Sequence, residues 1–250
     1  MPARPRPPSA VADLIGLMQD EADPGDAEIL ARYFKTGPGG YGEGDVFLGI
    51  KLSRLRTILK PHRTVPFVPA EWLPLLHSPI HEHRLACLVI MAERAQRAAA
   101  AERAELYGTY LANTAQINNW DLVDVSAAAV VGGYLMDRDR GILYRLARSP
   151  LVWDRRIAVI STHRFIRAGQ SGDIYALALR LRDDDHDLIH KAVGWMLREA
   201  GRRVSREELL AFLDQHAASL PRVTLRYAIE HLGPEQRAHY RQLRPGTIGE

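Results

Sequence analysis

Residues 151–216 have the sequence LVWDRRIAVISTHRFIRAGQSGDIYALALRLRDDDHDLIHKAVGWMLREAGRRVSREELLAFLDQH. Apolar residues at helical spacing divide this stretch into the segments Leu151–Arg167, Asp173–Arg182, Leu188–Ala200 and Glu207–His216. The segments form pairs that recur after roughly 35–40 residues, a period that fits HEAT-like repeats. Such pairs stack into a curved α-solenoid with a concave face. A plain helical bundle has the same local pattern, so the spacing alone leaves both architectures open.

The rest of the chain shows the same helical periodicity, and no segment alternates convincingly as a strand would. Further apolar stripes begin near residues 10, 53, 71, 82, 102 and 120, with short connections between them. We therefore predict an all-α fold with a single HEAT-like repeat domain over residues 10–242. Residues 1–9, which include the proline-rich sequence MPARPRPP, are expected to be a disordered tail, and residues 243–250 a flexible one.

Basic residues are concentrated in one part of the chain. The net charge of all 250 residues is +3, whereas residues 137–206 hold 15 Arg or Lys against 9 Asp or Glu, a net of +6. Nearly all of these cations are arginine, whose planar guanidinium group can bind two phosphate oxygens at once. The excess fits a surface for a polyanion, but it fits the amino-acid usage of a GC-rich genome equally well.

Composition also excludes several classes of protein. Cys87 is the only cysteine, so neither an intrachain disulfide nor a cysteine-based zinc cluster is possible, and we expect a buried thiol. No run reaches the roughly 18 apolar residues of a membrane span, and the N-terminus lacks an apolar signal core, so we expect a cytoplasmic protein. His186 and His190 are four residues apart, but no catalytic Glu follows the first, so we expect no metal.

One glycine-rich segment, Thr36–Asp45, interrupts the helical pattern. It lacks the Gly-Lys-Ser/Thr sequence of a phosphate-binding loop and does not follow a clear strand. We therefore predict a flexible loop between the first helices rather than a nucleotide site.

Residues 118–124 have the sequence NNWDLVD. If a helix begins here, Trp120 and Asp124 lie on the same face, one turn apart. One of the two asparagines would cap this helix, and Asp121 would occupy its first turn, where backbone N–H groups favour a carboxylate. On spacing alone, core packing is the commoner role for such a Trp, and an arginine is an alternative partner for Asp124.

A second tryptophan occurs within KAVGWMLRE, residues 191–199. In a helix, Lys191, Trp195 and Arg198 would share one side. Gly194 inside a helix costs about 1 kcal/mol relative to Ala. It indicates either a tight crossing of two helices or the close approach of another molecule.

Two adjacent arginines, Arg155 and Arg156, follow Trp153 at the start of another expected helix. On a concave surface they would hold a phosphate backbone. The alternative is a solvated charged face.

Together these motifs resemble those of the AlkD-like DNA alkylation repair family, bacterial DNA glycosylases built from HEAT-like repeats. The resemblance spans roughly residues 31–232. Its specific part is the combination of the runs at residues 119–124 and 191–199, because either run alone is a weak signal. The other matching runs are Ala31–Tyr33, Phe47–Ile50, Arg155–Arg156, Arg226 and Ile229–Leu232.

The resemblance implies an activity. Such enzymes hydrolyse the N-glycosidic bond of positively charged alkylated bases, such as 3-methyladenine and 7-methylguanine, in duplex DNA during base excision repair. They do so without flipping the base into a pocket, unlike most glycosylases. The essential carboxylate corresponds to Asp124, and the two cleft tryptophans correspond to Trp120 and Trp195.

The resemblance also implies a DNA-binding surface. Tyr33 would contact the lesion, and Arg156 would contact the DNA backbone. We expect Arg155, Lys191 and Arg198 on the same surface. No lysine is an evident Schiff-base nucleophile, so the resemblance implies a monofunctional glycosylase that works as a monomer without a cofactor.

The chain departs from the family pattern in two places. The Gly37–Gly44 loop is longer than the equivalent connection, and Asn119 stands where an aromatic residue can precede the Trp. Either change would alter grip or lesion range. Two other functions remain open: a non-catalytic HEAT-like protein that binds damaged or branched DNA, and a protein-binding scaffold.

Overall fold

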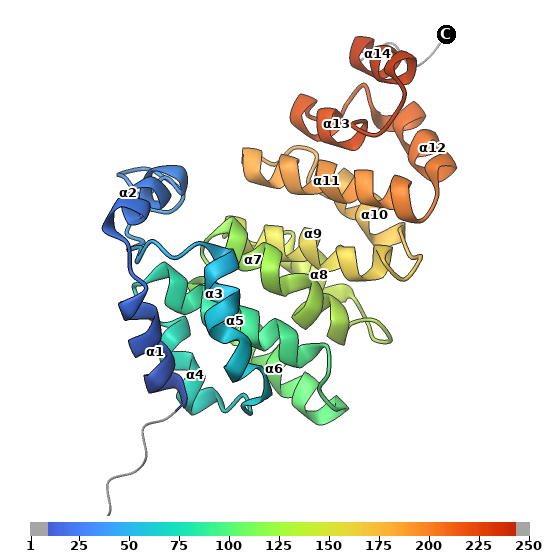
Figure 1. Cartoon of the computed structure of the whole chain (residues 1–250). Helices are drawn as coiled ribbons and strands as arrows, with labels where there is room; N and C mark the ends of the chain where they lie inside the picture. Colours follow the sequence, from blue (N-terminus) through green and yellow to red (C-terminus); the bar gives the residue numbers. More distant parts are fainter. Residues whose placement is uncertain (1–9, 244–250) are drawn as a thin grey trace, which may run out of the picture. The chain divides into compact units, whose positions relative to one another are not determined.

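A computed structural model describes residues 10–243, and within this range the fold is all-helical (Figure 1). The isolated bridge between Val46 and Ile80 is the sole β pairing there. These observations confirm the all-α class. The predicted single domain over residues 10–242 stays a prediction, and the predicted tails lie outside the described residues, apart from Leu243.

The chain divides after Ser126 into two compact units. The first unit contains α1 (Ala10–Asp20), α2 (Pro24–Tyr33), α3 (Leu52–Leu59), α4 (Pro69–Leu76), α5 (His81–Ala95), α6 (Ala100–Ala112), α7 (Trp120–Ala127, whose last residue falls in the second unit) and the short 3₁₀ helices η1 (Lys60–Thr64) and η2 (Thr114–Gln116). The second unit contains the π-helical turn η3 (Ala128–Gly132), α8 (Gly141–Leu146), α9 (Val152–Ile166), α10 (Gly172–Arg180), α11 (Asp187–Arg203), α12 (Arg206–His216), α13 (Arg222–Ala228) and α14 (Pro234–Gln242).

Helix α5 forms the centre of the first unit. Its residues Leu85, Leu88, Ile90 and Met91 are at most 4% exposed, and α3, α4 and α6 pack against it. Cys87 lies on the same helix and is completely buried; burial raises the pKa of its thiol to about 12. The expected role of this cysteine as a small buried hydrophobe is confirmed.

The connection from α2 to α3 is anchored to α5 through one carboxylate. Glu82, 1% exposed, accepts hydrogen bonds from the backbone N–H groups of Leu48, Gly49 and Ile50 at 2.9–3.1 Å. Gly49 has a φ of 91°, and a Cβ there would lie 2.1 Å from the carbonyl oxygen of Asp23. Residues 48–50, which follow the glycine-rich segment, are therefore fixed by the buried side chain of Glu82 and by position 49, which only glycine can occupy.

The second unit is built from stacked helix pairs. α11 packs between α9 and α13, while α10 packs on α9 and α11, and α12 packs on α11 (Figure 1). α9 with α10 and α11 with α12 are the pairs expected from the spacing. Layered packing of neighbouring pairs is typical of HEAT-like repeats and not of a plain bundle.

Side chains cap both helices of the second pair. Ser205 accepts the N–H of Glu208 at 3.1 Å at the start of α12. The ring nitrogen Nδ1 of His186 accepts the N–H of Leu188 at 3.1 Å at the start of α11. One of the two histidines considered as a metal pair therefore has a structural role at a helix end.

Gly194 lies where α11 crosses α13. A Cβ at this position would be 2.5 Å from the carbonyl oxygen of Thr224 and 2.6 Å from the Cβ of Tyr227. Of the two explanations for this glycine, the tight crossing of two helices is the one that the structure bears out.

Among the described helices, none is long and apolar enough to cross a membrane.

We predict that Gly194→Ala lowers the free energy of unfolding by about 1–3 kcal/mol, because the new methyl group would overlap the backbone of α13. Gly108→Ala in α6 is the matched control, since no heavy atom lies within 4 Å of a Cβ there. The control should gain up to about 1 kcal/mol from helix propensity. Urea unfolding followed by circular dichroism measures both, and equal destabilisation of the two variants would contradict the steric explanation.

Candidate active site

The start of α7 is fixed by hydrogen bonds from its own sequence. The carbonyl of Asn119 accepts the N–H of Val123 at 3.2 Å, and its side-chain oxygen accepts the N–H of Trp120 at 2.8 Å. Asp121 accepts the N–H of Leu122 at 2.8 Å through Oδ1. Asn119 is thus the predicted cap and Asp121 the predicted first-turn carboxylate.

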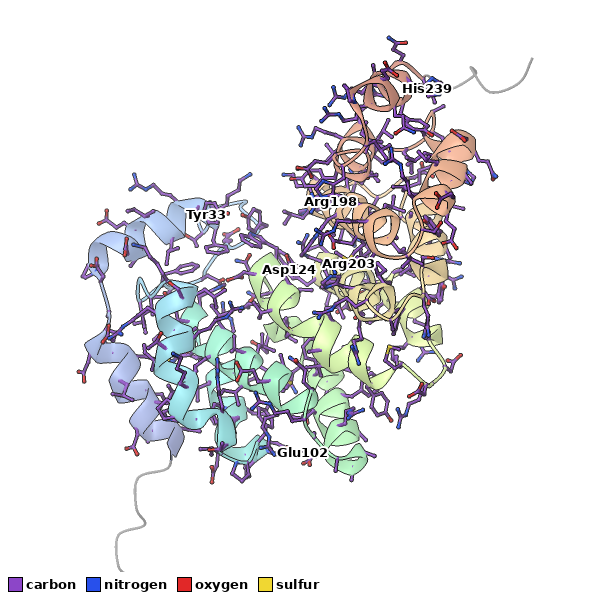
Figure 2. All side chains as sticks on the ribbon, turned by 45° about the vertical axis from the view of Figure 1, so that its right-hand side comes forward. Tyr33, Glu102, Asp124, Arg198, Arg203 and His239 are labelled. Atoms are coloured by element: carbon purple, nitrogen blue, oxygen red, sulfur yellow. The ribbon has the colours of Figure 1, made fainter. Side chains whose placement is uncertain are left out.

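Because α7 begins at Trp120, Trp120 and Asp124 lie on one helical face, one turn apart. Both side chains are half-buried. Figure 2 shows Asp124 on α7 and Tyr33 at the end of α2, both in the first unit. An aromatic ring and a carboxylate are therefore presented together, as the spacing predicts.

An aromatic cluster surrounds the indole of Trp120. The ring stacks on Phe34, with centroids 5.1 Å apart, and meets Tyr33 edge-on at 5.9 Å. The indole N–H donates to the hydroxyl of Tyr41 at 3.3 Å, and that hydroxyl donates to the carbonyl of Tyr33 at 3.2 Å. Tyr33 is 62% exposed, so the cluster has one open aromatic edge, and the structure brings Tyr33 and Trp120 together.

Beside this cluster, a buried histidine forms hydrogen bonds to two carboxylates. His81, 1% exposed, contacts Asp45 through Nδ1 at 3.0 Å and Asp121 through Nε2 at 2.8 Å. Arg84 donates to the other oxygen of Asp45 at 2.6 Å. The side-chain amide of Asn119 also donates to Asp45, at 3.5 Å. The end of the glycine-rich loop and the first turn of α7 are therefore held through one imidazole.

The charges of this network balance. Burial on its own would lower the pKa of His81, but the hydrogen bonds to Asp121 and Asp45 and their negative charges raise it to about 9. Burial would likewise raise the pKa of Asp45, but the hydrogen bond from His81 and the charge of Arg84 hold it below its ordinary value. Two cations thus face two carboxylates in a buried site, as buried charges require.

The aromatic contacts continue down to the same histidine. Phe47 stacks on His81 at 4.5 Å and on Phe34 at 5.2 Å, and Phe34 stacks on Trp120. Sequence reasoning missed Phe34, Tyr41, Asp45, Phe47 and His81. Of these, Tyr41 and Asp45 carried a signal, because an aromatic and an acidic residue stand out in a glycine-rich segment that otherwise has the composition of a loop.

In the second unit, α11 presents the expected face. Trp195 is half-buried, and its ring centroid lies 6.1 Å from the imidazole of His163. Lys191 forms an exposed ion pair with Asp187 at 2.6 Å. Arg198 pairs with Glu230 and remains partly exposed.

Arginines surround the neighbouring histidine. Burial lowers the pKa of His163, and the positive charges of Arg203, Arg167 and Arg202 lower it further, against the opposing charge of Glu199. A neutral imidazole therefore lies beside Trp195 on a face with an excess of positive charge. Figure 2 labels Arg198 and Arg203 on this helix.

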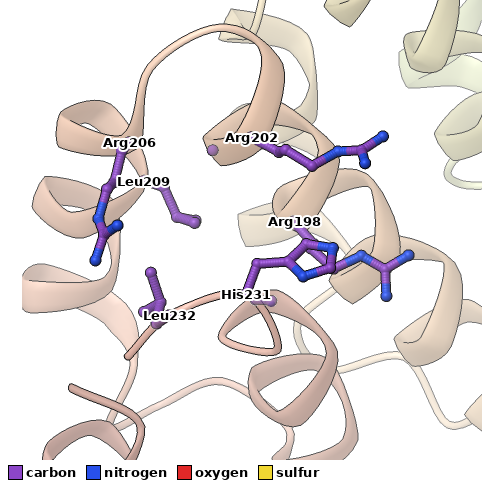
Figure 3. A pocket seen from close by; sticks show the side chains of 8 residues that line it. Arg198, Arg202, Arg206, Leu209, His231 and Leu232 are labelled. Carbon is purple, nitrogen blue, oxygen red and sulfur yellow. The ribbon is translucent and has the colours of Figure 1, made fainter. Parts of the chain in front are cut away.

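The end of α11 also borders a pocket of about 270 Å³ (Figure 3). Its polar lining residues are Arg198, Arg202, Arg206 and His231, and its apolar ones include Leu209, Ala228 and Leu232. Arg206 donates to Gln236 at 2.6 Å. This composition suits a sugar–phosphate better than a cationic base.

The two adjacent arginines of α9 are embedded in the protein. Arg155 binds both oxygens of Asp184, at 2.6 and 3.2 Å, and donates to the carbonyls of Ser149 and Pro150. These bonds favour a structural role for Arg155 over the predicted contact with phosphate. Arg156 is 5% exposed and donates to the carbonyl of Leu188 at 2.6 Å, so it ties α9 to α11; its contact with DNA stays a prediction.

Comparison with known proteins identifies the family. The family model for DNA alkylation repair enzymes matches residues 14–232. The chain belongs to this family. A solved structure described as a predicted DNA alkylation repair enzyme from Enterococcus faecalis is similar in fold, with a TM-score of 0.67 and 17% identity over 85% of this chain and 97% of that chain. No curated protein matches the chain.

We predict that the first unit loses stability in alkaline solution because of His81. Its pKa is raised by folding, so its contribution is complete below the unfolded value of about 6.5 and is lost as pH rises through about 9. The loss amounts to at most about 3 kcal/mol. Urea unfolding at pH 6 and pH 9.5 measures it, and a wild-type pH dependence that persists unchanged in His81→Gln would contradict the assignment.

Proposed function

We propose that this protein is a monofunctional DNA glycosylase, which hydrolyses the N-glycosidic bond of cationic alkylated bases such as 3-methyladenine and 7-methylguanine in duplex DNA. The observation that carries the proposal is the half-buried indole of Trp120 and the carboxylate of Asp124 on one face of α7. In a chain that belongs to the DNA alkylation repair enzyme family, this pair favours chemistry over core packing.

The charge of the lesion explains why a carboxylate is sufficient. A base alkylated on a ring nitrogen already carries a positive charge, so it leaves as a neutral molecule without a general acid. As the bond from C1′ to the base breaks, its electron pair moves to the base and the sugar gains oxocarbenium character, as in glycoside hydrolysis. A water oxygen then bonds to C1′ and loses a proton. Asp124 would stabilise the cationic sugar and orient or deprotonate this water.

Aromatic faces would assist the same step. The electron-rich face of an indole attracts a cation, so Trp120 would stabilise the developing sugar cation. The hydrogen bond to Tyr41 and the stack on Phe34 hold this ring in place before the substrate arrives. We assign Trp195 in the second unit to the same role, and exposed Tyr33 to contact with the lesion. No enclosed pocket for a flipped base is needed in this arrangement.

Cations near the C-terminal half of the chain would bind phosphates. The candidates are Lys191, Arg198 and the arginines that line the pocket at the end of α11. Arg155 is left out of this set because its ion pair is largely buried and its donors bind both oxygens of Asp184 and two backbone carbonyls. Action as a monomer without a cofactor, in the cytoplasm and within base excision repair, remains a prediction.

We predict that Asp124→Asn reduces single-turnover release of 7-methylguanine from methylated duplex DNA by about 100-fold, since it removes the charge that stabilises the sugar cation. Folding and duplex affinity should be nearly unchanged. Asp13→Asn, which alters an exposed carboxylate of α1, is the control and should retain full activity. Equal release by wild type and Asp124→Asn would overturn the catalytic assignment, and binding without release by the wild type would favour a non-catalytic DNA-binding protein.

We predict opposite outcomes for two cations. Lys191→Ala should lower the slope of log affinity against log salt by about 1 and barely affect stability, because its ion pair is exposed. Arg155→Ala should leave the slope unchanged and cost roughly 3 kcal/mol of stability, because it breaks a largely buried ion pair. Binding titrations at several salt concentrations and urea unfolding separate the two effects. A reduced slope for Arg155→Ala would show that Arg155 contacts phosphate after all.

A further inference from the structure

We propose that His81 is a positioning residue, which holds the Trp120–Asp124 face of α7 against the loop that carries Tyr41. This inference rests on the proposed function, because the position of that face affects catalysis only if the face acts on the substrate. His81 itself is 1% exposed and is separated from solvent, so it acts through other residues and not on the DNA.

The first connection between His81 and the site consists of hydrogen bonds. Nδ1 bonds Asp45, the last residue of the glycine-rich segment, and Nε2 bonds Asp121, the residue directly after Trp120. Asp45 is also bonded by Asn119, the cap of α7. The imidazole thus bridges two elements that are 36 and 40 residues from it in sequence. The bond to Asp121 ends directly after Trp120, and the bond to Asp45 continues to Asn119, directly before Trp120.

The second connection is the column of rings. The imidazole stacks on Phe47, and Phe34 lies on Phe47 and under the indole of Trp120. The indole N–H then meets Tyr41, which belongs to the same loop as Asp45. A displacement of the imidazole would therefore reach Trp120 both through the backbone of α7 and through the ring faces.

The bridge requires both ring N–H groups. A neutral imidazole has one donor and one acceptor nitrogen, so it can donate to only one of the two carboxylates. The charged groups that bond His81 are Asp45 from the loop and Asp121 from α7. On its own helix, Arg84 binds Asp45, and Glu82 binds the backbone N–H groups of residues 48–50. Loss of the proton would leave a carboxylate facing a lone pair, and the first turn of α7 would separate from the loop.

The test uses the full chain labelled with 5-fluorotryptophan and followed by ¹⁹F NMR from pH 6.5 to pH 10. The protein contains four tryptophans, and Trp120→Phe identifies the resonance of Trp120. In the wild type, this resonance should move with an inflection near pH 9, while that of Trp72, fully buried elsewhere in the first unit, should not. His81→Gln should abolish the inflection. Tyr33 and Tyr41 remain in that variant, so an inflection that they cause would persist.

Activity supplies the second readout. Single-turnover release of 7-methylguanine should fall at least tenfold in His81→Gln, with duplex affinity within about twofold of the wild type, because misplacement affects the chemical step more than binding. His83→Gln is the matched control: His83 is a buried histidine of the same helix, and its Nδ1 bonds the hydroxyl of Ser78 at 2.9 Å. It should retain both the inflection and the rate.

Asp121→Asn keeps the test decisive if His81→Gln does not fold. Removing one of the two carboxylates that hold the proton should move the inflection of Trp120 to lower pH by about one unit or more. An inflection unchanged in Asp121→Asn, or one that persists in folded His81→Gln with a wild-type rate, would overturn the inference. If the wild type releases no base yet shows the His81-dependent inflection, the positioning contact stands and the proposed function fails.

Discussion

A buried imidazolium between two carboxylates is the interaction on which the candidate site depends. Taken alone, burying three ionisable groups is unfavourable, because each loses its hydration. Here the ring donates to both acids, Arg84 neutralises the remaining charge, and the side chain of Asn119 adds a further donor to Asp45. The result is a fixed orientation for α7, and with it for an indole and a carboxylate that neither the helix nor the loop would hold alone.

The helices and their pairing could be predicted because their signals are local. Apolar periodicity indicated α9 with α10 and α11 with α12, and the asparagines before Trp120 indicated a cap. The same locality made Trp120 and Asp124 visible, since residues four apart in a helix share a face. For these helices, the residues that determine the conformation lie within the helix itself or directly beside it, so the sequence is sufficient to predict them.

The network beneath the site could not be predicted, because its members come from separate elements and no period relates them. Asp45, His81 and Asp121 meet only after α5, α7 and the loop have packed. Arg155 shows the converse limit: in sequence it belongs to a basic stretch, yet its partner Asp184 lies 29 residues away in the acidic run Asp183–Asp185. Charge composition identified a basic region, but only packing shows which arginines are already neutralised.

The close crossing at Gly194 has a consequence for how this family of sequences can diverge. Gly194 faces the backbone of α13, whereas the ring of the next residue, Trp195, lies 6.1 Å from the imidazole of His163 on α9. A slip of α11 by one residue would drive an indole into the carbonyl of Thr224, so steric exclusion helps to fix the register of the helix, together with the hydrogen bond that the Thr224 hydroxyl donates to the carbonyl of His190 at 3.1 Å. Insertions or deletions of three or four residues, close to one helical turn, would therefore disturb this crossing least, and they would also keep Lys191, Trp195 and Arg198 near one side of α11.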